Sequence, residues 1–174
     1  MTGESGIADD YGTFVARLDP ALAIVTLYHD GERSGCLVGF HSSCSIDPPL
    51  HAVWLSQANH TYELALVSEL LAVHLVDAGA HDLAEHFGGL TGDETDKFAG
   101  IAWHPGPDDV PLLDELPNRF VGRRVRVLDA SGDHICMVVE PVAVDLGEAA
   151  NPKNLHLSDA TDVDSGHDAD DQRS

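Results

Sequence analysis

The sequence has few basic residues for its length. Its 174 residues include 30 acidic but only 9 basic side chains, which gives a formal net charge of -21 at pH 7. A protein with this balance has no spare cationic surface with which to neutralise the phosphates of a nucleic acid or to bind anionic lipid. We therefore expect no nucleic-acid partner and no membrane partner. An anionic ligand must be held locally, by backbone N–H groups or a few well-placed cations.

Cysteines and long apolar runs are also scarce. The three cysteines, Cys36, Cys44 and Cys136, contain no C-x-x-C pair, and we expect them to be small core residues in a reducing compartment. The first ten residues, MTGESGIADD, are polar and acidic, unlike a signal peptide. No apolar run approaches the ~20 residues that a membrane-spanning helix needs. These features favour a cytoplasmic protein.

Several common active-site motifs are missing from the sequence. It contains no G-x-S-x-G, no Walker loop and no G-x-G-x-x-G, which excludes the usual hydrolase, nucleotidase and Rossmann patterns. Its eleven histidines form no H-x-H or H-E-x-x-H pattern. His81 and His86 are five residues apart, on different sides of a helix. We therefore expect no metal site.

The residues that are present indicate a strand-rich fold. Hydrophobic residues make up 43% of the chain, enough for a real core. Asp30-Gly31 separates two apolar runs and is typical of a hairpin turn. Asn59 is a candidate N-cap for a following helix. We expect helices at residues 7–18, 61–68, 81–87 and 93–98, a proline-rich loop at 104–111, and six strands at 21–28, 34–40, 50–55, 70–76, 118–128 and 134–144.

This pattern of elements predicts a mainly β (α+β) fold. The strands are joined by tight turns or short helices, and their spacing is too irregular for an alternating βαβ series. A small β-barrel, with helices packed on its outside and across one end, fits the tally best. From about Gly147 the sequence is rich in Asp, Ser, Ala and Asn. We expect this part to be a solvated tail because it has little apolar area to bury.

Three segments could contact a ligand. Residues 35–50 leave a strand through small and hydroxyl residues, which could bind a phosphate or a polar ring edge, or could be an ordinary strand-to-loop transition. Residues 56–61 lead into a helix start, which suits an anion, although Asn59 capping explains the same residues. His134 begins a strand after Gly132-Asp133 and could transfer a proton or contact a ring, or be a simple turn histidine.

The first of these segments resembles a known signature. Residues 43–50, SCSIDPPL, resemble the S-x-S-[IL]-D-P-P-L signature of the flavin reductase-like family of FMN-binding split barrels. Four further matches follow in family order: ALAIVTLYHDGERSG (21–35), LAVHLV (71–76), DKFAGIAW (96–103) and GDHICMVVE (132–140). The resemblance implies a split-barrel domain over residues 1–146, followed by an acidic, disordered tail over residues 147–174.

The resemblance also implies a function and a site. It implies a homodimer that holds FMN or FAD at the subunit interface and transfers hydride from NADH or NADPH to the flavin, whose electrons a flavin-using monooxygenase could consume. His134 would be the catalytic residue beside the nicotinamide or the flavin edge. Carried over by position, the cofactor-binding residues would be Val38, Gly39, Phe40, His41, Ser42, Ser43, Ala58, Asn59, His60, Thr61 and Lys97, the last as a phosphate partner.

The chain departs from the family pattern at three places. The stretch Leu37-Val38-Gly39-Phe40-His41 replaces T-[VA]-[NS]-[SA]-F, His60 stands where a basic residue is frequent, and the C-terminal G-x-[YF] segment is absent. These differences leave two rivals to a flavin reductase. One is a split barrel that uses a deazaflavin, and the other is a module that binds a flavin or another planar ligand without turnover.

Overall fold

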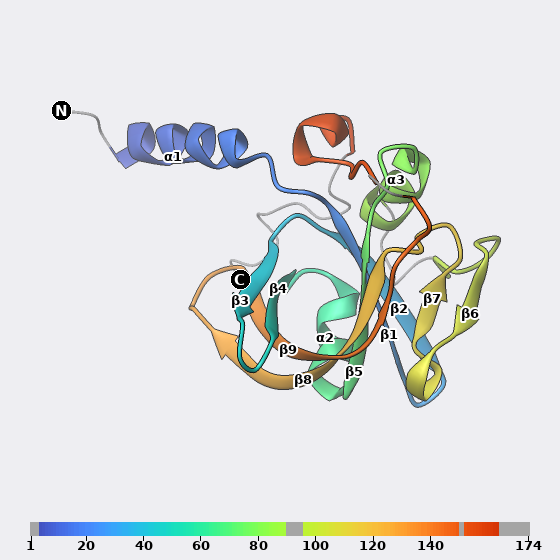
Figure 1. Ribbon diagram of the computed structural model, residues 1–174. Coiled ribbons are helices and arrows are strands. Elements are labelled where there is room, and N and C mark those ends of the chain that lie inside the picture. The colour runs from blue at the N-terminus through green and yellow to red at the C-terminus, as the bar shows by residue number, and fades with distance from the viewer. Residues whose placement is uncertain (1–3, 90–95, 150–151, 164–174) are drawn as a thin grey trace.

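A computed structural model describes residues 4–89, 96–149 and 152–163 (Figure 1). Nine strands lie within these ranges: β1 (Ala23–His29), β2 (Glu32–Val38), β3 (His41–Ser45), β4 (Leu50–Ser56), β5 (Leu70–Leu75), β6 (Trp103–Pro105), β7 (Pro111–Leu113), β8 (Arg119–Asp129) and β9 (His134–Asp145). The helices are α1 (Glu4–Leu18), α2 (His60–Val67) and α3 (His81–Gly89), with single 3₁₀ turns η1 (Pro107–Asp109) and η2 (Leu157–Ala160).

Seven strands form one antiparallel sheet in the order β2-β1-β5-β8-β9-β4-β3. The sheet curls around α2, which lies inside its curve (Figure 1). Strands β2 and β3 are its two edges and do not pair with each other, so the barrel is split. The hairpin between β1 and β2 turns at Asp30 and Gly31, both with positive φ (47° and 90°), as a tight hairpin turn requires. The expected mainly β split barrel is confirmed.

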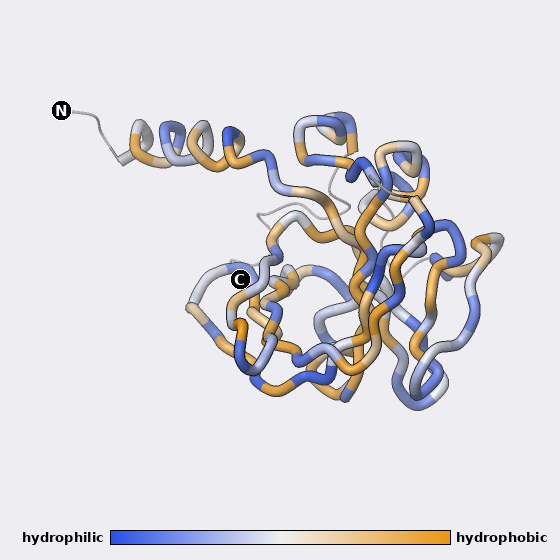
Figure 2. Tube along the Cα trace, in the orientation of Figure 1, coloured by the Kyte–Doolittle hydropathy of each residue, from blue (hydrophilic) through white to orange (hydrophobic). Residues whose placement is uncertain are grey.

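The interior of the curled sheet is the first of two main hydrophobic cores. It gathers alternate residues of the strands, as the period of two predicts, including Val25 of β1, Val53 of β4 and Met137 of β9, all fully buried. Leu64 of α2 belongs to the same core. The apolar residues on the strands that enclose α2 are visible as orange segments of the tube (Figure 2). Helix α2 therefore fills part of the interior of the curled sheet.

A second core lies between the outer face of the sheet and α3. Ile24 of β1 and Phe87 of α3 are both fully buried in it, and Phe87 packs edge-on against Phe98 at 5.6 Å. Strand β1 therefore has buried residues on both faces, which explains why its sequence is a continuous apolar run without polar alternation. The C-terminal segment contributes Leu155 to this core.

The expected solvated tail beginning at Gly147 is wrong for residues 152–163. The Leu155 N–H donates to the Val76 carbonyl at 2.7 Å, and the Leu155 carbonyl accepts from the Leu22 N–H at 2.8 Å. Leu155 is only 3% exposed. Ala160 and Val163 of the same segment also pack on the second core, so a mostly polar segment can be held by backbone pairing and a few apolar contacts, which overall composition does not reveal. The remainder of the predicted tail, residues 164–174, lies outside the described residues.

Other expectations fail at short or polar segments. Strand β3 was not predicted, and neither were β6 and β7, which lie around the expected proline-rich loop at 104–111. Residues 93–95 of the expected helix at 93–98 lie outside the described residues, and residues 97–100 form turns. Helix α1 was predicted, but its apolar stripe stays exposed because the helix projects from the body (Figure 1); Ile7, Tyr11, Phe14 and Leu18 are 58–65% exposed.

Gly35 lies where β2 passes beneath α3, and we expect the variant Gly35→Ala to be destabilised. A Cβ here would lie 2.9 Å from Cε1 of Phe87 and 3.0 Å from the Val25 carbonyl oxygen. The carbonyl cannot move without breaking the pairing of β1 and β2. Urea unfolding should therefore show a loss of about 2 kcal/mol. The matched control is Gly79→Ala, whose added Cβ has no atom within 4 Å. Equal stabilities of the two variants would contradict the prediction.

Candidate active site

A cavity of about 280 Å³ opens where the end of β2 faces the end of β4. Five of the predicted site residues line it: Val38, Gly39, Phe40, Asn59 and His134. The pairing of β4 with β9 places Ser56 opposite His134, which brings the start of β9 to this edge. Parts of the three segments singled out in the sequence, residues 36–40, Ser56 with Asn59, and His134, therefore meet at one place.

The mouth of this cavity carries two rings. His134 and Phe40 pack with their ring centroids 5.3 Å apart, and Phe40 is 48% exposed. The His134 Nδ1–H donates to Oδ1 of Asp133 at 2.8 Å, because a carboxylate can only accept. This hydrogen bond holds the pKa of Asp133 below its ordinary value. The pairing fixes the orientation of the imidazole and leaves Nε2 for a ligand.

The floor and walls of the cavity are apolar, and sequence reasoning missed part of them. Trp54 and Leu55 come from β4, and Cys36 and Leu37 from β2. The alternation of β4 could have suggested Trp54, and Ser56 stands at the start of the polar segment already noted. Val15 of α1 and Leu157 of η2 come from segments with no sequence signal for this site. The result is a slot with hydrophobic sides and a partly polar rim.

The start of α2 approaches the same cavity. The Asn59 side chain accepts from the Thr61 N–H at 3.0 Å, which confirms the predicted N-cap. The Thr61 hydroxyl is buried and hydrogen bonds Ser34 at 2.8 Å. His60 Nε2 lies 2.6 Å from a Glu32 carboxylate oxygen, and the Ala58 N–H donates to the Ser56 hydroxyl. Ala58, His60 and Thr61 thus adjoin the cavity without lining it.

Three predicted residues lie on β3, away from this cavity. His41 and Ser43 line a different, larger cavity. Ser42 is exposed and, by the alternation of the strand, points to the opposite side from its two neighbours. The S-x-S signature was expected to contact the ligand through these residues. The structure separates them because the chain enters an extended edge strand directly after Phe40.

Lys97 is placed differently from the expected phosphate contact. It is only 4% exposed, and its Nζ donates to the carbonyls of Gly35 and Phe87, each at 3.1 Å. Burial lowers the pKa of this ammonium. The side chain therefore joins β2 to α3 inside the second core and does not line the cavity.

The cysteines and possible metal ligands add nothing to the site chemistry. Cys36 and Cys136 are buried, as expected of core residues, whereas Cys44 on β3 is exposed. Burial raises the pKa of the Cys36 thiol to about 11. In the part of the chain that the structure describes, no three metal-ligating side chains come together. Within the same ranges, no helix has the length and apolar character needed to cross a membrane.

Comparisons with known proteins agree with the fold. Residues 15–162 match the family described as "Flavin reductase like domain". A relative from Rhizobium rhizogenes, named FMN reductase (NADH) RutF 2, is 30% identical over 78% of this chain and 77% of its own. An FMN-binding protein from Thermus thermophilus, solved with bound p-hydroxybenzaldehyde, has 26% identity and a TM-score of 0.72, with 79% of each chain covered.

A third similar protein is named as a homolog of a monooxygenase component. Nitrilotriacetate monooxygenase component B from Mycobacterium thermoresistibile is 25% identical, with a TM-score of 0.71 and coverage of 83% of this chain and 82% of that one. The family match covers most of the chain, including the cavity residues and the packed C-terminal segment to residue 162. The chain therefore belongs to the flavin reductase-like family of split-barrel proteins.

Proposed function

We propose that this protein is an NAD(P)H:flavin reductase that binds FMN or FAD in the cavity between β2 and β4. The observation that carries the proposal is the meeting of Val38, Gly39, Phe40, Asn59 and His134 around one apolar slot. A planar ring suits such a slot because its two faces need only apolar contacts, while its edge needs a few hydrogen bonds.

The residues around the slot fit a flavin. Leu55 and Trp54 offer an apolar surface for the rings, and the backbone at Gly39 and Phe40 can meet polar ring atoms. The N-terminus of α2, at Asn59, supplies positive potential for a phosphate. A bound flavin would supply the redox chemistry, by accepting two electrons and a proton from a nicotinamide and passing the electrons on. The protein's own task is to position the two ring systems face to face.

His134 is the residue best placed to orient the nicotinamide or the flavin edge. The hydrogen bond from its Nδ1–H to Asp133 fixes the orientation of the imidazole ring, so Nε2 is held in one position. Phe40 packs against its ring and restricts its rotation. Together the two rings can exclude water from one side of the slot, which strengthens the hydrogen bonds formed inside.

The phosphate end of the site is weak for an anion. His60 is the basic group at the start of α2, and it is paired with the Glu32 carboxylate. The carboxylate offsets any positive charge that the imidazole carries. Phosphate binding would therefore depend on backbone N–H groups and the helix dipole. We expect the affinity for FMN to depend on salt concentration, and we expect its rings to contribute more to that affinity than its phosphate.

The proposal is tested by ligand titration followed by turnover. Tryptophan fluorescence of the purified protein is titrated with FMN, FAD and a deazaflavin, and the oxidation of NADH and of NADPH is then followed with each. We expect saturable binding of FMN or FAD and many turnovers per protein with one of the nicotinamides. Failure to bind either flavin, or binding without NAD(P)H oxidation, would overturn it.

A deazaflavin is the second candidate ligand, favoured by the residues at 37–41. Leu37 and Phe40 replace the threonine and the small residue of the family pattern, and His41, the first residue of β3, replaces its aromatic residue. Fewer hydroxyls at the ring edge suit a ring with fewer hydrogen-bonding atoms. Tighter binding of the deazaflavin than of FMN and FAD in the same titration would favour this candidate.

We also propose that the protein works as a homodimer. The apolar stripe of α1 is exposed and the same helix contributes Val15 to the cavity, so a second copy that covers α1 would also close the site. Light scattering should give twice the chain mass.

The monooxygenase component among the similar structures supports a flavin-using monooxygenase as the consumer of reduced flavin. The test is a coupled assay in which this protein, NAD(P)H and flavin are added to such a monooxygenase, and oxidation of the monooxygenase's substrate should increase.

The variant Lys97→Met distinguishes a structural lysine from a phosphate ligand. Because the Lys97 Nζ is engaged by two carbonyls inside the core, we expect the Kd for FMN to change less than about threefold. Lumiflavin, which has no phosphate, is the comparison ligand and should show the same ratio. A Kd for FMN that rises tenfold or more, with the Kd for lumiflavin unchanged, would instead assign a phosphate contact to Lys97.

A further inference from the structure

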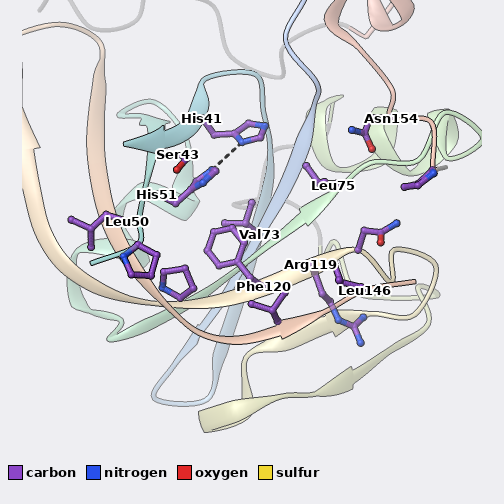
Figure 3. A pocket seen from close by; sticks show the side chains of 15 residues that line it. His41, Ser43, Leu50, His51, Val73, Leu75, Arg119, Phe120, Leu146 and Asn154 are labelled. Atoms are coloured by element: carbon purple, nitrogen blue, oxygen red, sulfur yellow. Dashed lines mark hydrogen bonds between the residues drawn. The ribbon is translucent and has the colours of Figure 1, made fainter. Parts of the chain in front are cut away.

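A second cavity, of about 440 Å³, lies at a different place in the barrel from the proposed flavin site. It forms where the start of β4, the end of β5, the start of β8 and the end of β9 come together, beside β3 (Figure 3). This volume falls in the range of cavities that bind drug-sized molecules. None of its lining residues lines the first cavity.

The body of this cavity is apolar. Val73 and Leu75 of β5 form one wall, with Phe120 of β8 beside Val73 (Figure 3). Val144 and Leu146 stand at the rim and are 62% and 81% exposed. A molecule that fills this space would gain mainly from leaving water, at about 25 cal/mol per Å² of apolar area buried.

One end of the cavity has a small polar cluster, formed by the His41 and His51 rings and the Ser43 hydroxyl (Figure 3). His41 Nε2 must donate to the Ala21 carbonyl, at 2.9 Å, because a carbonyl only accepts. In a neutral His41, Nδ1 is then an acceptor, so the His51 Nε2–H donates to it at 3.1 Å. This chain of bonds leaves Nδ1 of a neutral His51 as an acceptor without a partner among the described residues.

His51 is uncharged in this arrangement. Burial, with a smaller contribution from His41, lowers the pKa of His51 to about 4. The opposite end of the cavity has a cation, but it is already engaged. Arg119 Nε donates to Asp145 at 2.9 Å and Nη1 donates to the Leu113 carbonyl at 2.8 Å. The cavity therefore offers a hydrogen-bond acceptor and apolar walls, with no unpaired charge that would attract an anion.

Asn154 at the edge does not alter this conclusion. Its Oδ1 and Oδ1 of Asp77 are buried without hydrogen-bond partners among the described atoms, and the two residues are paired in a β-bridge. An exchange of the Asn154 amide oxygen and nitrogen would turn a donor towards the side chain of its bridge partner Asp77 if the two side chains face each other. The ligand-facing polar groups are thus those of His51 and Ser43.

We propose that this cavity is a second binding site, for a neutral small molecule with a one- or two-ring apolar body and a single hydroxyl or N–H donor. The rings would lie among Val73, Phe120 and Val144, and the donor would meet the acceptor groups at His51 and Ser43. The site is separate from the flavin cavity, so its occupancy does not require flavin.

The probe for this site is 2-naphthol, compared with naphthalene, which lacks the donor, and 2-naphthoate, which carries a charge. Calorimetry with the full chain should show saturable binding of 2-naphthol that persists with excess FMN. We expect 2-naphthoate to bind more than about tenfold more weakly, because its charge would be buried unpaired. The variant His51→Leu should weaken the binding of 2-naphthol about fivefold and leave the binding of naphthalene unchanged.

A matched pair of rim variants locates the site. Val144→Trp places a large side chain at the rim of the cavity, and Val142→Trp is its control on the same strand, because Val142 is 43% exposed and does not line the cavity. Only the first should weaken 2-naphthol, by roughly tenfold or more. The proposal is overturned if 2-naphthol shows no saturable binding, if FMN displaces it, or if both variants bind it equally.

Discussion

Replacing His134 with alanine is expected to slow NAD(P)H-dependent flavin reduction about 100-fold, while the Kd for FMN changes less than about threefold. The reason is the position of His134 at the cavity mouth, where it borders the slot with Phe40 without forming its floor. Loss of the imidazole removes a group that orients the reacting rings and leaves the apolar walls intact. A 100-fold change corresponds to about 2.7 kcal/mol in the barrier.

Two companion variants sharpen this test. Asp133→Asn removes the acceptor charge that fixes His134 and should have an intermediate effect, because the imidazole remains but is less well oriented. His29→Ala is the matched control, since His29 lies at the far end of β1 and does not line the cavity. Stopped-flow measurement of flavin reduction separates this step from product release. An equal loss of FMN affinity and of rate would assign His134 a binding or structural role instead.

The strands that the sequence predicted are those with strong apolar patterns. Strand β1 is buried on both faces and β9 is an apolar run along its first half, so each has a clear signature. Strand β3, HSSCS, has no apolar residue that would distinguish it, because as an edge strand it is largely exposed on both faces. Strands β6 and β7 have three residues each and contain prolines. Their pairing depends on tertiary context that local sequence does not contain.

The candidate site was predictable where neighbouring residues share one strand end. Val38, Gly39 and Phe40 follow each other at the end of β2, so a local motif could locate all three. Contacts between distant segments were not predictable in this way. Leu157 reaches the cavity because Leu155, two residues earlier, pairs with both Leu22 and Val76. Part of the expected tail therefore lines the candidate site.

The role of Lys97 shows the limit of reasoning from charge. The only lysine in the first 150 residues of an acidic chain suggests a phosphate ligand, because basic residues are scarce. In the structure its Nζ instead donates to the carbonyls of Gly35 and Phe87, which need a donor inside the second core. The same acidic composition thus remains compatible with a flavin site only if backbone groups and the α2 N-terminus hold the phosphate.

The second large effect is expected at His74, a fully buried histidine that joins β5 to β1 and β7. Its Nδ1–H donates to the Ile24 carbonyl, and its Nε2 accepts from the Leu113 N–H, each at 3.1 Å. The variant His74→Leu leaves both backbone groups unsatisfied. We therefore expect it to lower the free energy of unfolding at pH 7 by about 3 kcal/mol. His29→Leu, at a partly exposed position, should change it by less than about 0.5 kcal/mol.

The same residue should make stability depend on pH. Burial lowers the pKa of His74 from 6.5 to about 4, so between these values the unfolded chain binds the proton and the folded chain does not. Stability contributed by neutral His74 is thus present above pH 6.5 and is lost as the pH falls towards 4. Between pH 7 and pH 5 this amounts to about 2 kcal/mol. Urea unfolding of the wild type and of His74→Leu at pH 7 and pH 5 isolates the contribution of His74, because protonation of other groups affects both proteins alike. The stability difference between wild type and His74→Leu should shrink from about 3 to about 1 kcal/mol, and an unchanged difference would mean that folding does not shift the pKa of His74.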